Sequence, residues 1–319
     1  MPRALFGAAI IVVLSACGDA RPTEAHRPVL DRVPSALLTG RIAFDRWFFG
    51  LGDDPIAALY VMHLTAGVTT KVLSQTPGEC ETDPSWSPDG TTIAYRAYCG
   101  AVAIVPGELF IGNVATNVIQ QITFNDVKDM HPAWSPSGAA LAFVRTVDGN
   151  HEIFVRNIAS LTDTRITHTP QIELNPAWSP GGNRIAFQRR YGASWSIVIR
   201  DLTTGQETVI NHDATASDEH PAWSPDGNTI AFARTQTDPV GVDNVLVYDL
   251  ATNTVVDSIV APGAESPAWS PAGDALVFSE QAYHGRKLQL DLFVVTLASK
   301  TKVRLTNTSI GERNPSWTQ

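Results

Sequence analysis

The sequence is poor in cysteine and in positive charge, and each shortage removes a class of function. The three cysteines, Cys17, Cys80 and Cys99, form no CxxC pair and have no histidine partner at zinc-binding spacing, so a structural metal knot is not indicated. Lysine and arginine number 23 against 32 aspartates and glutamates, which gives the 319-residue chain a net charge of −9, and no basic run occurs. Most of this surface would repel a nucleic-acid backbone, which argues against nucleic-acid binding.

Recognisable catalytic motifs are also missing. The sequence has no GxSxG, HExxH, P-loop or Rossmann glycine fingerprint. The string GASWS from Gly192 fails the nucleophile-elbow pattern because its last residue is Ser196. These absences favour a protein that is not an enzyme, although an active site built from scattered loop residues stays compatible with them.

The apolar run at the N-terminus has the pattern of an export signal. Residues 2–16 read PRALFGAAIIVVLSA, with one early basic residue and small residues at the end. The run is too short to span a bilayer as a stable anchor. LSAC, ending at Cys17, resembles the bacterial lipobox, in which the cysteine is acylated; the alternative is an ordinary signal that leaves Cys17 as a free thiol. We therefore expect a signal peptide over residues 1–16 and a lipidated Cys17 that anchors the protein to a membrane of the bacterial cell envelope, facing the periplasm or the cell surface.

Proline and glycine punctuate the rest of the chain in repeated strings. Residues 17–38 are polar, proline-rich and without periodicity, which predicts a flexible tether after the lipidated cysteine. A Pro-x-Trp-Ser-Pro-x-Gly string then recurs to the end of the chain, and its tryptophans lie 44 to 48 residues apart, a period typical of propeller blades. The strings begin at Pro84, Pro132, Pro176, Pro221 and Pro267, with a shorter PSWT from Pro315.

Each repeat predicts one four-stranded blade. An apolar run of the IAF type and two further strand signals accompany each string, and the Ser-Pro-Asp-Gly turn predicts a hairpin between the tryptophan strand and the IAF strand. The chain opens on an IAF strand and ends on a tryptophan strand. We therefore predict an all-β fold over residues 39–319: a six-bladed β-propeller of four-stranded blades, closed by pairing of the C-terminal strand with the first blade. The repeated tryptophans are expected to pack between blades.

The unit PxWSPDG…IAF…LYVxDL resembles the PD40, or WD40-like, repeat of TolB-family propellers and of the propellers in some prolyl-oligopeptidase-type proteases. The resemblance covers residues 39–319 in six registered copies. It implies a TolB-like propeller. In the TolB family the propeller mouth docks a peptidoglycan-associated lipoprotein, and an N-terminal α/β domain precedes the propeller where this chain has a short tether.

Five of the six repeats carry a carboxylate three residues before the marker proline. The residues at this position are Glu81, Asp129, Glu173, Asp218, Ala264 and Glu312. By the symmetry of the repeat, the carboxylates are expected to ring one mouth of the channel. One interpretation is a negative funnel that attracts a cation, an amine or a basic peptide, with calcium as a candidate metal. The other is that each carboxylate accepts backbone N–H bonds within its own loop.

The residue immediately before each marker proline is polar in every repeat. The residues are Asp83, His131, Asn175, His220, Ser266 and Asn314. His131 and His220 are candidate channel-mouth residues because they occupy this position in two repeats. No spacing makes them a metal pair, and the alternative is that they are turn-bound or surface residues.

Cys80 and Cys99 flank one predicted hairpin. Cys80 precedes the tryptophan strand and Cys99 ends the IAF strand, so the two fall opposite each other or one residue out of step, depending on whether Gly90 forms a bulge. In an exported protein this arrangement predicts a disulfide, with two free thiols as the alternative.

Three functions follow from these features. The first is an exported lipoprotein whose propeller is a binding platform for an envelope protein or peptide. The second is a propeller enzyme, a lyase or hydrolase of an extracellular sugar or lactone with a metal at the channel mouth, which rests on fold analogy. The third is a structural module of the envelope. The sequence favours the binding platform because the predicted acidic mouth comes without a catalytic motif.

Overall fold

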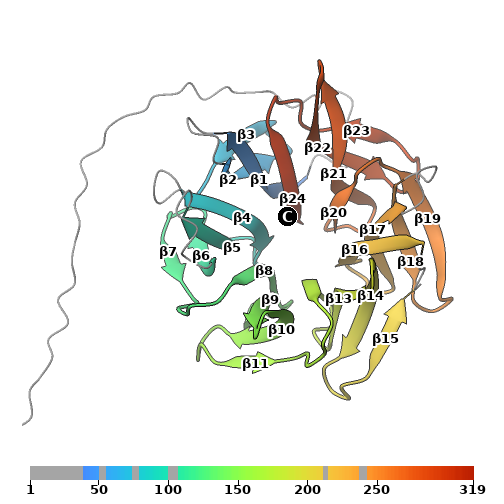
Figure 1. Ribbon diagram of the computed structural model, residues 1–319. Coiled ribbons are helices and arrows are strands. Elements are labelled where there is room, and N and C mark those ends of the chain that lie inside the picture. The colour runs from blue at the N-terminus through green and yellow to red at the C-terminus, as the bar shows by residue number, and fades with distance from the viewer. Residues whose placement is uncertain (1–38, 50–54, 74–78, 100–106, 211–214, 237–242) are drawn as a thin grey trace, which may run out of the picture.

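The computed structural model describes residues 39–49, 55–73, 79–99, 107–210, 215–236 and 243–319. These residues form 24 strands in six antiparallel four-stranded sheets, arranged as the blades of a propeller (Figure 1). The predicted fold class, number of blades and number of strands per blade are confirmed. The predicted signal peptide and tether over residues 1–38 lie outside the described residues. Within the described ranges, no helix is long and apolar enough to cross a membrane.

Each blade consists of an innermost, a second, a third and an outer strand. The innermost strands are β4 (Glu79–Trp86), β8 (Asp129–Trp134), β12 (Glu173–Trp178), β16 (Ala216–Trp223), β20 (Glu265–Trp269) and β24 (Gly311–Thr318). The second strands are β1 (Arg41–Phe49), β5 (Thr92–Cys99), β9 (Ala140–Val147), β13 (Arg184–Tyr191), β17 (Thr229–Gln236) and β21 (Ala275–His284). The third strands are β2 (Pro55–His63), β6 (Glu108–Asn113), β10 (Asn150–Asn157), β14 (Ser194–Asp201), β18 (Asn244–Asp249) and β22 (Lys287–Thr296). The outer strands are β3 (Val68–Lys71), β7 (Ile119–Gln121), β11 (Asp163–Arg165), β15 (Glu207–Ile210), β19 (Thr254–Val260) and β23 (Lys302–Arg304).

The first blade is built from both ends of the propeller sequence. β24 pairs antiparallel with β1, with Arg41 opposite Thr318 and Ile42 opposite Trp317. Figure 1 shows the red strand β24 beside the blue strand β1. The innermost strands contact one another in succession around the ring, and β24 contacts both β20 and β4. The predicted closure by the C-terminal strand is therefore confirmed, and it removes the open inner edge that an unclosed array of blades would leave.

Neighbouring blades pack face to face through apolar side chains. One buried cluster joins Ala43 and Leu59 of the first blade to Trp86, Ile93 and Tyr95 of the second. Because both faces of a blade are covered in this way, the strands read as nearly continuous apolar runs rather than as alternating polar and apolar residues.

The repeated tryptophans fasten one blade to the next. Three of them donate an indole hydrogen bond, 3.0 to 3.2 Å long, to a backbone carbonyl of the neighbouring blade: Trp178 to Ala133, Trp223 to Ala177 and Trp269 to Ala222. Trp223 is only 8% exposed and packs against apolar residues of the preceding blade. The predicted role of the tryptophans in packing between blades is confirmed.

We expect Trp223→Ala to lower the free energy of unfolding by about 3–5 kcal/mol, because it opens a large cavity between two blades. Urea denaturation followed by circular dichroism measures this loss. The control is Trp195→Ala, at a half-buried tryptophan of β14 outside the repeated string, which should cost clearly less. Equal losses at both positions would contradict a special role for the repeated tryptophans.

Candidate functional site

Every innermost strand carries a β-bulge just before its marker proline. The pairing of β4 with β5, for example, skips from Thr82 to Ser85, so that one extra residue is accommodated on β4. The residue before the proline adopts a left-handed backbone in all six repeats, with φ between 50° and 57°. We call these six residues the channel ring: Asp83, His131, Asn175, His220, Ser266 and Asn314.

The channel ring encloses a cavity at the centre of the propeller. The six ring residues and the six marker prolines line this cavity of about 130 Å³. Left-handed backbone is cheapest for glycine, and other residues incur strain on the order of 1–3 kcal/mol each, somewhat less for Asn, Asp and His. No ring position is glycine, so polar side chains stand at the cavity wall in place of the residue that would strain the backbone least. The sequence singled out His131 and His220, and the structure brings both into this ring.

A buried carboxyl group of the first blade lies behind the ring. Asp45 on β1 is fully buried, and its Oδ2 accepts hydrogen bonds from Asn314 Nδ2 at 2.9 Å and from the Asp83 backbone N–H at 3.1 Å. Asn314 Nδ2 also donates to Asp83 Oδ1 at 3.0 Å. Two carboxyl groups thus share one amide donor where the closing strand meets the second blade. Asp45 was not predicted as a site residue, although an acidic residue within an apolar strand was an available signal.

Gln188 on β13 repeats this arrangement three blades further on. Its Oε1 accepts hydrogen bonds from Asn175 Nδ2 at 2.8 Å and from the His220 backbone N–H at 2.9 Å. The Gln188 amide oxygen therefore accepts the same pair of hydrogen bonds at this blade that the Asp45 carboxyl accepts at the first. A neutral group suffices for the structural task, so the carboxyl at position 45 adds a charge that the fold does not require.

The electrostatics of the ring follow from its burial. Burial raises the pKa of Asp45 to about 7, and the neighbouring Asp83 carboxylate acts in the same direction. Burial lowers the pKa of His131, and it lowers that of His220 to about 3. Both imidazoles are therefore neutral at pH 7, and each has one ring nitrogen that can accept a hydrogen bond. In the described part of the chain, Nδ1 of His131 and Nδ1 of His220 are buried without a hydrogen-bond partner.

A second cavity opens where the Ser-Pro turns meet, and we call it the funnel. It has a volume of about 620 Å³ and is lined by the repeated tryptophans and by small, proline and polar residues of the strings that contain them. Pro176 and Pro221 line both the funnel and the cavity of the channel ring. The two cavities are therefore neighbours along one channel.

The carboxylates predicted to form an acidic mouth lie elsewhere. Four of them are at most 1% exposed and form ion pairs of 2.6 to 2.8 Å with arginines of the second strands: Asp129 with Arg145, Glu173 with Arg189, Asp218 with Arg234, and Glu312 with Arg46. The register places each arginine directly opposite its carboxylate. The negative funnel is not formed by these residues, because their charges are neutralised in place.

The fifth carboxylate and the repeat with Ala264 depart from this pattern, because neither has an arginine of the second strand opposite the carboxylate position. Glu81 lies opposite Ala97 and is 2% exposed. In the repeat with Ala264, a carboxylate stands on the second strand instead, where Glu280 binds Lys302 at 2.8 Å. The signal for these pairs was present in the sequence, since an arginine follows the start of the IAF run by four residues in four repeats.

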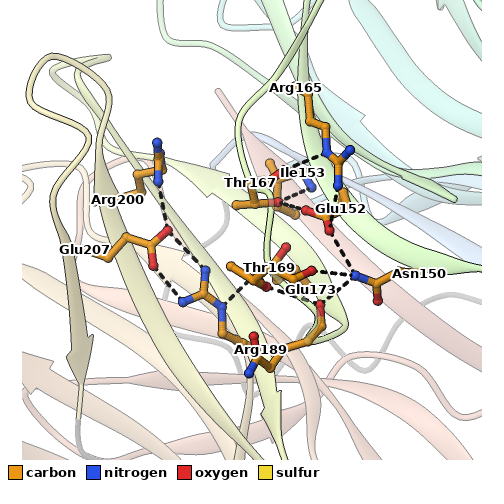
Figure 2. A network of polar contacts seen from close by, with 11 residues as sticks. Asn150, Glu152, Ile153, Arg165, Thr167, Thr169, Glu173, Arg189, Arg200 and Glu207 are labelled. Atoms are coloured by element: carbon orange, nitrogen blue, oxygen red, sulfur yellow. Dashed lines mark hydrogen bonds and ion pairs between the residues drawn. The ribbon is translucent and has the colours of Figure 1, made fainter. Parts of the chain in front are cut away.

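The junction between β10 and β12 shows the polar contacts that such groups make (Figure 2). Arg189 binds Glu173 at 2.8 Å and Glu207 at 2.6 Å. Asn150 Nδ2 donates to Glu152 Oε1 at 2.9 Å and also to the backbone carbonyls of Thr169 and Gln171. Among the described residues, no group of three or more His, Cys, Asp or Glu side chains is placed to hold a metal ion. The predicted calcium site is therefore not formed by the acidic positions.

The predicted disulfide falls partly outside the described side chains. Cys80 on β4 is buried and pairs in register with Tyr98, while Cys99 pairs with Glu79. The two cysteines are thus offset by one residue in the strand register, which is the second of the two arrangements that the sequence allowed. The side chain of Cys99 lies outside the described residues, and the disulfide stays a prediction.

Known proteins share this fold. Residues 104–175 match the family model described as the dipeptidyl peptidase IV N-terminal region, and no curated protein gives a significant match. TolB from Acinetobacter baumannii superposes with a TM-score of 0.73 at 21% identity, over 88% of this chain and 67% of that one. A putative TolB from Agrobacterium tumefaciens gives 0.65 at 22% identity, over 87% and 93%. An oligogalacturonate lyase from Vibrio parahaemolyticus gives 0.59 at 13% identity, over 85% and 80%.

The class that these observations define is a six-bladed, all-β propeller. Within this class the chain has a TolB-like propeller fold, as its repeats indicated. The likeness to a lyase shows that a propeller of similar shape also occurs in an enzyme. At these identities the likeness concerns the fold, so function has to be argued from the site.

We expect Arg189→Met to lower the free energy of unfolding by about 3–5 kcal/mol, because it leaves the fully buried Glu173 without its cation. The double variant Glu173→Gln with Arg189→Met should recover much of this loss. Arg190→Met is the matched control, since Arg190 is exposed and its replacement should change stability by less than about 0.5 kcal/mol. Chemical denaturation of the wild-type protein and the three variants measures these changes. Similar losses of stability in Arg189→Met and Arg190→Met would contradict the pairing of Arg189 with Glu173.

We expect the stability difference between the wild-type protein and Asp45→Asn to depend on pH. The Asp45 pKa is raised from 3.8 to about 7 on folding, so the wild-type protein loses stability relative to the amide variant as the pH rises from about 4 through 7. Above about pH 8 the difference should level off. Urea denaturation of both proteins from pH 5 to 9 measures it, and a difference that stays constant with pH would rule out a raised pKa.

Proposed function

We propose that this protein is an exported lipoprotein of the bacterial cell envelope whose propeller is a binding platform for a partner protein or peptide. The observation that carries this proposal is the channel itself: a wide funnel contributed by all six repeats leads to a ring of six polar residues held in strained backbone. Concave sites that combine aromatic and apolar side chains with a few convergent polar groups are the usual form of a binding site.

The proposed entrance is the funnel rather than an acidic mouth. Its tryptophan and proline side chains alternate with serine and other polar groups, and tryptophan is a frequent anchor in protein interfaces. The TolB-like fold supports a docking role, because the family that the repeats resemble docks a lipoprotein at the propeller mouth. Export and lipidation are supported by the apolar run over residues 2–16 and by LSAC at Cys17.

We expect photo-crosslinking in the producing cells to place the partner at the funnel. A benzophenone amino acid at Asp89 or at Gln319, both at the funnel wall, should give a discrete adduct with one envelope protein. The same group at Thr208 on β15 or at Thr254 on β19 serves as control, because both residues are exposed on outer strands.

The crosslinking result separates the proposed functions. Adducts at the funnel positions alone would support docking through the funnel. Equal labelling at all four positions, or none at the funnel, would overturn it. Turnover of an oligogalacturonide by the purified chain would instead favour the lyase alternative.

A further inference from the structure

One pair of ring residues leaves a gap of a particular size. His131 Nε2 and Asp83 Oδ2 are 4.0 Å apart, which is too long for a hydrogen bond, and both residues line the ring cavity. Two charge-assisted hydrogen bonds of about 2.8 Å that meet at roughly a right angle span this separation. The gap therefore fits one small donor atom bound to both residues.

The charges around the gap favour a cationic donor. Asp83 offers a carboxylate oxygen, and the Asp45 carboxyl lies directly behind it, joined to it through Asn314. His131 is neutral at pH 7, so it can accept a hydrogen bond from a cation without repelling it. Arg96 and Arg313 act electrostatically on the ring histidines but are not among the residues that line the ring cavity.

The route to the gap selects the shape of the ligand. A ligand that enters through the funnel passes tryptophan and proline side chains before it reaches the polar ring. A lysine side chain suits this route, since its four methylene groups can lie against the tryptophan and proline side chains while its compact ammonium group reaches the ring. The planar, five-donor fork of arginine is wider and matches the single gap less well.

We propose that the channel ring binds the ammonium group of a lysine side chain that a partner inserts through the funnel, with Asp83 and His131 as the hydrogen-bond acceptors. This proposal rests on the proposed function, and it names the chemical group that the partner places in the channel. A cation bound beside Asp83 also stabilises the ionised form of Asp45, which releases its proton to solvent. Lysine binding is therefore coupled to the release of up to one proton below about pH 7.

The test uses n-butylammonium, which has the length and charge of a lysine side chain, with the full chain and isothermal titration calorimetry. We expect n-butylammonium to bind the wild-type protein saturably. Tetramethylammonium, which has the same charge but no N–H donor, should not bind. Asp83→Asn and His131→Asn should each weaken butylammonium binding, the first about tenfold or more. Both variants should fold, because asparagine occupies the same left-handed position at Asn175 and Asn314.

The matched control is Asp226→Asn, which makes the same change at an exposed turn carboxylate outside the ring and should leave binding unaltered. Titrations at pH 6 in two buffers of different ionisation enthalpy count the protons released. The wild-type protein should release protons on binding, and Asp45→Asn should bind without releasing any.

Two results would overturn the proposal: no binding of butylammonium to the wild-type protein, or equal weakening by Asp83→Asn and Asp226→Asn. If butylammonium fails to bind while funnel crosslinks persist, docking through the funnel stands and the lysine site is wrong. If butylammonium binds as expected but no funnel crosslink forms, the ring is a cation site and partner docking fails.

Discussion

The bulge before each marker proline is the constraint on which the site depends. One extra residue in each innermost strand changes which side chains face the channel, and the left-handed backbone at that residue turns its side chain to the channel wall. In four blades the carboxylate two positions earlier keeps its regular register and faces an arginine of the second strand. The bulge, repeated six times, thus separates these buried ion pairs from a polar channel ring.

This separation explains why the molecule combines rigidity with a chemically varied centre. Tryptophan indoles and apolar clusters bind each blade to its neighbour, and the arginine–carboxylate pairs cross-link the two inner strands within a blade. With the frame held by these repeated contacts, the six ring positions are free to differ. They carry aspartate, histidine, asparagine and serine around one small cavity. Preorganised polar groups on a rigid frame are what selective binding requires.

The first blade has a special place in this arrangement because it is where the ring closes. Asn314 on the last strand bridges Asp45 on the first strand and Asp83 on the second blade, so the closure and the binding site share the same polar groups. Gln188 shows that a neutral group can hold the corresponding blade. The charge at Asp45 therefore links proton uptake, ring closure and the occupancy of the cavity.

The sequence by itself determined the architecture. The period of the tryptophan strings, the Ser-Pro turns and the offset between the first and last strands were sufficient for the number of blades, the hairpins and the closure, because these depend on local turn chemistry and on strand order. The polar residue before each proline was also visible, including His131 and His220. What only the tertiary structure decided was which side chains face the channel. Regular symmetry placed Glu81, Asp129, Glu173, Asp218 and Glu312 at an open mouth, whereas the bulge and the strand register bury them, and only the packing of the closing strand brings Asp45 behind Asp83.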